Sequence, residues 1–307
     1  MLHEITFPSF NQRDNVYGWI YVPASEPKGI IQLIHGFGEH SRRYLHMIAT
    51  FVEDGYIVAA DDHVGHGKTA LENNVWGDWG DKGFTTMVED EKRLHDLVVE
   101  KYPDLPYFMY GHSMGSFITR MYMTRFGDDL DGVVLCGTTG EWPNLSDNIA
   151  YVKPFAEKDP TGSNPDIGGT LMGWMFARCP EGVKLGNEWI CDDEYVQYDH
   201  ANDPFDAFSK PTSNRSWLYF LQMMEDITGV EWAKKVPTDL LVFNIAGDQD
   251  PVGQFGEGIY QVSNWLMNEG CDVITKLYPG YRHEIHNYTE LKDMVEFDIL
   301  EFLDICL

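Results

Sequence analysis

The sequence lacks a long apolar segment. In its 307 residues no uninterrupted apolar run approaches the ~20 residues that a membrane-spanning helix needs. Residues 1–6 carry neither a basic region nor a long apolar run, so we expect no signal peptide. The sequence therefore predicts a cytoplasmic protein that does not insert stably into a membrane.

Basic residues are scarce. The chain has 22 lysines and arginines against 49 aspartates and glutamates, which gives a formal net charge of −27. Nucleic acids and anionic membrane surfaces attract basic patches, so this imbalance argues against both as partners. It also weighs against strongly anionic substrates. The oligomeric state has no signal in the sequence.

Paired cysteines are also missing. The chain has an odd number of cysteines, and no two of them form a C-x-x-C motif. The sequence therefore predicts neither a disulfide framework nor a zinc site, and buried free thiols instead. The five are Cys136, Cys179, Cys191, Cys271 and Cys306.

Short apolar strands alternate with helical patterns along most of the chain. Residues 3–7 and 16–22 have strand composition on either side of a turn-forming segment, which predicts a β-hairpin. The alternation that follows predicts a mostly parallel central sheet with helices on both faces. We expect further strands at 29–34, 56–60, 132–137, 238–246 and 272–278, and helices at 44–53, 87–102, 116–123, 255–268 and 289–305.

The alternation of strands and helices stops within residues 138–237. This segment is rich in tryptophan, methionine, glycine and proline, which indicates an inserted cap of short helices. We therefore expect a core made of residues 1–137 and 238–307. Indole and thioether surfaces form adaptable apolar pockets, so some of these side chains are candidates to line an acyl tunnel. The tryptophans are Trp142, Trp174, Trp189, Trp217 and Trp232.

A strained turn is predicted at residues 111–115, which read Gly-His-Ser-Met-Gly. The turn directly follows the apolar run 107–110 and directly precedes the helical pattern 116–123. A G-x-S-x-G between strand and helix is the nucleophile elbow, which lifts a serine hydroxyl clear of the sheet edge. Glycines are needed because the turn brings backbone close to its neighbours. The pattern predicts Ser113 as a nucleophile.

Two later loops supply candidates for an acid and a base. Residues 247–253 and 278–286 each follow a predicted strand, at the same edge of the sheet as the elbow. A serine nucleophile needs a base to take its proton and an acid to orient that base, here in the chain order serine, acid, histidine. The candidates are Asp248 and Asp250 for the acid, and His283 and His286 for the base.

Three motifs carry a resemblance to a known family. They are the sequence His-Gly-Phe-Gly-Glu-His-Ser-Arg-Arg-Tyr at 35–44, Asp-His-Val-Gly-His-Gly at 62–67, and the elbow at 111–115. With the late acid and histidine loops, the chain resembles the α/β-hydrolase superfamily. Within that superfamily it resembles the monoacylglycerol lipase and lysophospholipase-like group, which overlaps the serine aminopeptidase family. The likeness spans residues 29–286, without most of the insert.

The resemblance implies a catalytic site and an activity. It maps the family's acid to Asp250 and its histidine to His283, and it implies an oxyanion hole made by the backbone N–H groups of Phe37 and Met114. The activity that it implies is that of a serine esterase on a lipid-like carboxylic ester, such as a monoacylglycerol. It implies no metal and no organic cofactor.

Other readings make different demands on the sequence. The histidines at 283 and 286 are spaced by three residues, not by the four of the H-E-x-x-H motif, which argues against metal catalysis. A non-catalytic ligand-binding protein of this fold would usually lack a triad member. An aminopeptidase would need carboxylates for the substrate amine, and the insert offers Glu181, Glu188, Asp192, Asp193 and Glu194.

Overall fold

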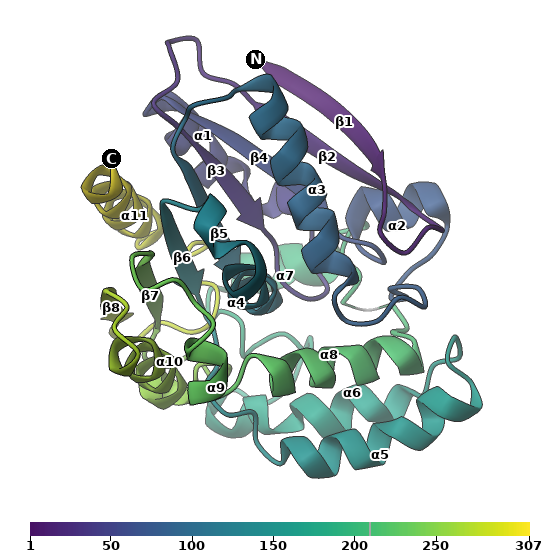
Figure 1. Ribbon diagram of the computed structural model, residues 1–307. Helices are drawn as coiled ribbons and strands as arrows, with labels where there is room; N and C mark the ends of the chain where they lie inside the picture. The colour runs from purple at the N-terminus through teal and green to yellow at the C-terminus, as the bar shows by residue number, and fades with distance from the viewer. Residues whose placement is uncertain (209) are drawn as a thin grey trace.

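A single eight-stranded sheet runs through the centre of the molecule (Figure 1). The computed structural model describes residues 1–208 and 210–307. The order of the strands across the sheet is β1-β2-β4-β3-β5-β6-β7-β8. The strands are β1 Leu2–Pro8, β2 Asn15–Tyr21, β3 Gly29–Ile34, β4 Tyr56–Asp62, β5 Tyr107–His112, β6 Gly132–Cys136, β7 Leu241–Gly247 and β8 Val273–Tyr278.

The sheet confirms the predicted topology. Strands β1 and β2 form the expected antiparallel hairpin, and β2 also pairs antiparallel with β4. From β4 to β8 all neighbouring strands are parallel. Every residue of β3, β4, β5 and β6 is buried, because these central strands are covered on both faces.

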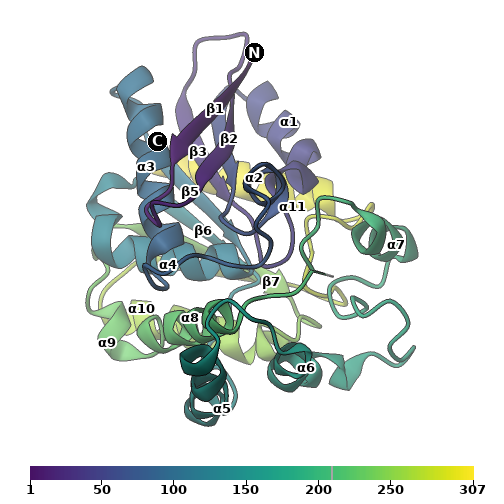
Figure 2. The same cartoon turned by 90° about the vertical axis from the view of Figure 1, so that its right-hand side faces the viewer.

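Helices cover both faces of the sheet, as predicted. Helices α1 and α11 lie on one face, and α3 and α4 lie on the other (Figure 2). The helices outside the stretch between β6 and β7 are α1 Leu45–Glu53, α2 Gly67–Asn73, α3 Thr86–Lys101, α4 Met114–Phe126, α10 Glu257–Asn268 and α11 Lys292–Cys306. Helix α2 was not expected, because its seven residues are too few to show a periodic apolar pattern.

The chain between β6 and β7 forms a run of short helices. These are α5 Leu145–Lys158, α6 Pro165–Met172, η3 Gly173–Arg178, α7 Glu194–Asn202, α8 Asn214–Asp226 and α9 Val230–Ala233. Helices α5, α6 and α8 lie together beyond the end of the sheet to which β3 and β5 point (Figure 1). The division into a core and a cap at 138 and 237 stays a prediction. Among the helices of the described residues, none combines the length and the apolar character needed to cross a bilayer.

Close approach of backbone explains the second glycine of the elbow. A Cβ atom on Gly115 would lie 2.1 Å from the carbonyl oxygen of Ile34, where α4 passes the end of β3. Gly115 has an ordinary helical backbone, so the constraint is space alone. The glycine is therefore what lets the helix after Ser113 dock on the sheet.

We predict that Gly115→Ala lowers the free energy of unfolding by about 2–3 kcal/mol, because the added methyl group forces α4 away from β3. Gly169→Ala is the matched control: it is also a helical glycine, and its Cβ would meet nothing within 4 Å. The control should gain about 0.5–1 kcal/mol from reduced backbone entropy in the unfolded chain. Denaturant unfolding of both variants measures the difference. Equal stabilities would contradict the assignment of a steric constraint.

Candidate active site

Ser113 occupies a strained turn between β5 and α4. Its backbone angles are φ 53° and ψ −122°, a conformation that residues with a side chain rarely adopt. The turn is held because the Ser113 N–H donates a 2.9 Å hydrogen bond to the carbonyl oxygen of Cys136 at the end of β6. These are the backbone features of a nucleophile elbow. The strain therefore lies at the residue that the sequence singles out.

His283 and Asp250 are in direct contact. Asp250 lies in the loop after β7 and His283 in the loop after β8, and these strands are neighbours in the sheet. The Nδ1 atom of His283 lies 2.9 Å from each carboxylate oxygen of Asp250, which is fully buried. Asp250 Oδ1 also accepts a 2.8 Å hydrogen bond from the N–H of Val252. Both side chains are thus fixed in one orientation.

The charge of Asp250 decides the titration of His283. Burial lowers the pKa of His283, but the negative charge of Asp250 and its hydrogen bond raise this pKa by more, so the net shift is upward. The carboxylate therefore compensates for the loss of water around the imidazole and stabilises an imidazolium when one forms.

Ser113 and His283 line the same small pocket. In the described part of the chain, the buried Nε2 of His283 has no hydrogen-bond partner, whereas Nδ1 is engaged by Asp250. Gly137 makes room for this ring: a Cβ there would lie 2.9 Å from Cε1 of His283. The structure thus brings together the three side chains that the resemblance selected.

The two alternative residues lie elsewhere. Asp248 accepts a 2.7 Å hydrogen bond from the N–H of Gly280 and so ties the loop after β7 to the loop after β8. His286 is buried and its ring stacks on Tyr44 with centroids 4.7 Å apart. Burial, and then the neighbouring His112, lower the pKa of His286 well below its ordinary value. Among the described contacts, Asp248 does not bond to the imidazole of His283, as an orienting acid would, and His286 does not bond to Asp250, as an oriented base would.

The loop after β3 lies against Ser113. A Cβ on Gly36 would be 3.0 Å from the Cβ of Ser113, and Phe37 and Ser113 line the same pocket. Within residues 1–208 and 210–307, the N–H groups of Phe37 and Met114 donate to no protein acceptor. Met114 is the first residue of α4, where an N–H has no partner inside the helix. Both amides are therefore available to an oxygen bound beside Ser113.

Glu39 anchors the loop that carries Phe37. Its Oε1 accepts hydrogen bonds of 2.6 Å from the Gly36 N–H and 2.6 Å from the Tyr44 hydroxyl, and it lies 3.2 Å from Nδ1 of His112. Burial raises the pKa of Glu39. The contact with His112 and the charge of Arg43 lower this pKa by a larger amount, so the net shift is downward. The loop is thus attached to an ionised carboxylate.

Arg43 links buried acids at the pocket of Ser113 and His283. Its side chain is 5% exposed and lies 2.8 Å from Glu284, 3.4 Å from Glu39 and 3.9 Å from Asp206. Burial raises the pKa of Asp206 to about 9. No role for these residues was expected from the sequence. The signal that could have found them is the spacing of Glu39 and Arg43, which are opposite charges four residues apart within the motif at 35–44.

A large apolar cavity adjoins Ser113. It has a volume of about 600 Å³, and Lys210 is the only charged residue among its described lining residues. Four of its lining residues also line a second small pocket that contains Ser113, on the side of Phe117 and Trp142, so the two spaces share a wall. Those shared residues are Phe37, Met172, Trp189 and Phe208.

The tryptophans of the segment between β6 and β7 divide into two groups. Trp189 and Trp217 line the large cavity, Trp142 and Trp189 line the pocket at Ser113, and Trp174 packs edge-on against Trp142. Trp232 instead packs under the guanidinium of Arg120, with its indole N–H donating to the Arg120 carbonyl. Part of the expected apolar pocket therefore comes from this segment.

Three carboxylates of this segment already have partners. Glu181 pairs with Arg282, Glu188 accepts the backbone N–H groups of residues 184–186, and Asp193 caps the start of α7. Together with the absence of a carboxylate from the described lining of the large cavity, these contacts leave no evident amine-binding acid there.

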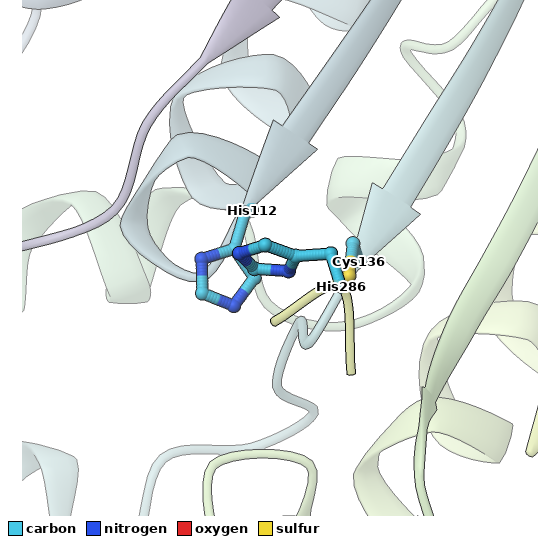
Figure 3. Close-up of side chains that lie close together, drawn as sticks. All are labelled: His112, Cys136 and His286. Atoms are coloured by element: carbon cyan, nitrogen blue, oxygen red, sulfur yellow. The ribbon is translucent and has the colours of Figure 1, made fainter. Parts of the chain in front are cut away.

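Two groups of described residues place possible metal ligands close together. His112, Cys136 and His286 form one buried group with ligand atoms within 4.8 Å of one another (Figure 3). Burial raises the pKa of the Cys136 thiol far above its ordinary value. Because the thiolate is the form that binds a metal, this shift disfavours Cys136 as a ligand. The second group is Asp61, His63 and Glu91.

The cysteines are free, and their burial differs from the prediction in part. Cys136, Cys191 and Cys271 are buried, as expected. Cys179 and Cys306 are only half-buried, so the prediction of five buried thiols was wrong for these two. Cys179 directly follows the 3-10 helix η3, and Cys306 is the last residue of α11.

Known proteins resemble the chain over most of its length. A family model described as serine aminopeptidase, S33 matches residues 25–290. A monoacylglycerol lipase of Mycolicibacterium smegmatis is 33% identical over 278 residues, which are 89% of this chain and 87% of that protein. The similarity therefore includes the segment between β6 and β7.

Solved structures match more closely still. A highly thermostable carboxyl esterase from Bacillus coagulans, crystallised in complex with glycerol, is 54% identical and has a TM-score of 0.97. A lipase solved in an open form is 35% identical and has a TM-score of 0.93. Each alignment covers 100% of this chain and 99% of the other chain.

We predict that Asp250→Asn reduces kcat by about 10⁴-fold on an ester substrate, because the imidazole loses its orienting charge. The same change removes what raises the pKa of His283 and leaves burial, which lowers it. Since a base must be unprotonated to act, the acid limb of the kcat/KM profile should move to lower pH. Asp248→Asn is the matched control and should keep the wild-type limb. An unmoved limb in the Asp250 variant would contradict this assignment.

Proposed function

The chain belongs to the serine aminopeptidase S33 family of α/β-hydrolases, in its monoacylglycerol lipase-like group, and we propose that it is a serine carboxylic ester hydrolase. The fold and the esterase and lipase relatives make it a hydrolase of the esterase or lipase type. The finer proposal is that its substrates are lipid-like esters such as monoacylglycerols, and that it works through an acyl-enzyme.

The proposed reaction has two halves. The Oγ of Ser113 attacks the ester carbonyl carbon while Nε2 of His283 takes its proton, and the C–O bond to the alcohol then breaks as His283 returns that proton to the leaving oxygen. Water, deprotonated by His283, then attacks the acyl-serine, and the proton returns to Oγ as the carboxylic acid leaves. Asp250 stabilises the imidazolium in both halves. This assignment is supported by the 2.9 Å contacts of His283 with Asp250.

Two backbone donors are proposed for the oxyanion of each tetrahedral intermediate. They are the N–H groups of Phe37 and Met114, from the loop after β3 and the start of α4. Donors aimed at a developing negative oxygen usually make the largest single contribution to catalysis of this kind. Support comes from their lack of another acceptor in the described residues and from the tie between Gly36 and Glu39.

The apolar cavity is the observation that carries the choice of substrate. Its described lining is mostly carbon, with Lys210 as its one charged residue, and it shares a wall with the pocket of Ser113. A hydrocarbon chain gains about 0.8 kcal/mol for each CH₂ group that it buries. We therefore propose that the cavity takes the acyl chain, and that residues 138–237 form the cap over it.

The family description also names an aminopeptidase activity, which is the second candidate. That activity requires an anionic group to hold the substrate ammonium close to Ser113. Glu39 and Glu284 line the small pocket that contains both Ser113 and His283, but both are paired with Arg43. The lining of the large cavity favours an acyl chain over a charged amine, so the ester is the proposed substrate.

The proposal is tested by kcat/KM values for p-nitrophenyl esters of increasing acyl length, measured beside an aminoacyl p-nitroanilide. We expect kcat/KM to rise with acyl length up to the capacity of the cavity, and turnover of the amide to be far slower. Ser113→Ala is the control and should lose several orders of magnitude on every ester. Preference for the amide would overturn the ester proposal, and full activity of the control would overturn the mechanism.

A second prediction concerns the shared wall of the cavity. Met172→Trp adds volume where the large cavity meets the pocket of Ser113, so it should lower the ratio of kcat/KM for dodecanoyl over butanoyl esters roughly tenfold or more. Val183→Trp is the matched control, because Val183 is 62% exposed and lines only the large cavity. An unchanged ratio in the Met172 variant would place the acyl chain elsewhere.

A further inference from the structure

A second cluster of titratable side chains lies apart from Ser113. Asp61 is near the end of β4, His63 directly follows this strand, and Glu91 lies in α3. The Nδ1 atom of His63 is 3.3 Å from Oδ1 of Asp61 and 3.3 Å from Oε1 of Glu91. Asp61 and Glu91 are 0% exposed and His63 is 2% exposed, so water does not solvate the cluster.

The two carboxylates lack the partners that buried acids need. In the described residues, both oxygens of Asp61 and the Oε1 of Glu91 have no hydrogen-bond partner. The other oxygen of Glu91 accepts a hydrogen bond from the side-chain amide of Gln32. No described lysine or arginine forms an ion pair with either acid. Two buried negative charges in one place are costly unless a cation compensates for them.

The tautomer of His63 makes the requirement sharper. Its Nε2 lies 3.1 Å from the carbonyl oxygen of His35, a group that can only accept, so Nε2 carries a proton and donates. In the neutral ring, Nδ1 then holds a lone pair. This lone pair lies between the two carboxylates, and the three acceptors repel one another unless a proton or a metal ion lies among them. A ligating histidine typically donates its other N–H to a backbone carbonyl in this way.

We propose that Asp61, His63 and Glu91 bind a divalent cation of the zinc type at a buried site, as three of its ligands. Zinc takes imidazole and carboxylate ligands at about 2.0–2.1 Å in a tetrahedral arrangement, which puts two ligand atoms about 3.3 Å apart. Both 3.3 Å distances from Nδ1 match that spacing, and all three ligand atoms lie within 4.8 Å of one another. The proposal departs from the sequence analysis, which expected no metal.

The bound cation would stabilise the loop that carries Phe37. The backbone N–H of His63 donates a 3.0 Å hydrogen bond to Nε2 of His35, and the two rings stack with centroids 3.8 Å apart. His35 directly precedes Gly36 and Phe37. Fixing His63 therefore fixes the start of this loop, without placing the cation at Ser113.

A proton is the alternative way to neutralise the cluster. Burial, and then the charge of Asp61, raise the pKa of Glu91 well above its ordinary value, so Glu91 could be protonated and share this proton with Asp61. A bound cation and a shared proton can be distinguished by replacing a carboxylate of the cluster with the corresponding amide. Asparagine or glutamine replaces a protonated carboxyl group at little cost, but both are poor zinc ligands.

The first experiment measures the metal content of the full chain. The protein is produced in medium supplemented with Zn²⁺, washed with a chelator and analysed by elemental mass spectrometry. We expect about one zinc ion per chain in the wild type, and a roughly tenfold or greater loss of bound zinc in Asp61→Asn and Glu91→Gln. Glu89→Gln is the matched control: it lies on the same helix, pairs with Arg125 at the surface, and should keep the metal.

The second experiment needs no variant and so does not depend on their folding. Wild-type protein is unfolded with chelator present and refolded with or without Zn²⁺, and its melting temperature is measured; refolding with Co²⁺ should give the visible absorption of a tetrahedral site. We expect Zn²⁺ to raise the melting temperature. Wild type that folds without metal and whose melting temperature does not respond to Zn²⁺ would overturn the proposal in favour of the shared proton.

Discussion

The hydrogen-bonded pair of His283 and Asp250 is the interaction on which the site depends. An imidazole buried at this position would lose its affinity for protons, and the adjacent carboxylate restores that affinity at a distance of 2.9 Å. The pair exists because β7 and β8 are parallel neighbours, with Gly247 beside Tyr278 at their ends. A Cβ on Gly247 would lie 2.0 Å from the carbonyl oxygen of Tyr281, so the backbones of the two loops pack too closely for a side chain at this position. The sheet thus sets the geometry of the proton transfer.

Charged and apolar groups line different cavities near Ser113. At the small pocket that contains Ser113 and His283, Arg43 neutralises the buried acids Glu39 and Glu284, and Glu39 holds the loop that carries Phe37. By contrast, the large cavity has a single charged residue in its described lining. This separation lets one site keep ionised groups in place while it offers hydrocarbon to a substrate. The net charge of −27 therefore says little about this part of the interior, where Glu39 and Glu284 share Arg43 as a partner.

Local patterns predicted the elements better than the contacts between them. The apolar runs and turn residues located all eight strands, to within a few residues at their ends, and the elbow pattern located the strained Ser113. Sequence alone could not decide between Asp248 and Asp250, because both follow β7 and only the path of the loop determines which one meets His283. The Asp61, His63 and Glu91 cluster escaped notice for a similar reason: α3 contributes Glu91 from far along the chain. The catalytic roles themselves stay predictions.

The most direct test of the central claim is covalent labelling with a fluorophosphonate, followed by peptide mapping. If Ser113 is activated by His283 and Asp250, one phosphonyl group should attach per chain, on the peptide that contains Ser113. The rate of labelling should fall by orders of magnitude in His283→Ala and stay near the wild-type rate in His286→Asn, a change that keeps a polar side chain beside Tyr44. Labelling at another residue, or at an undiminished rate without the imidazole of His283, would contradict the account.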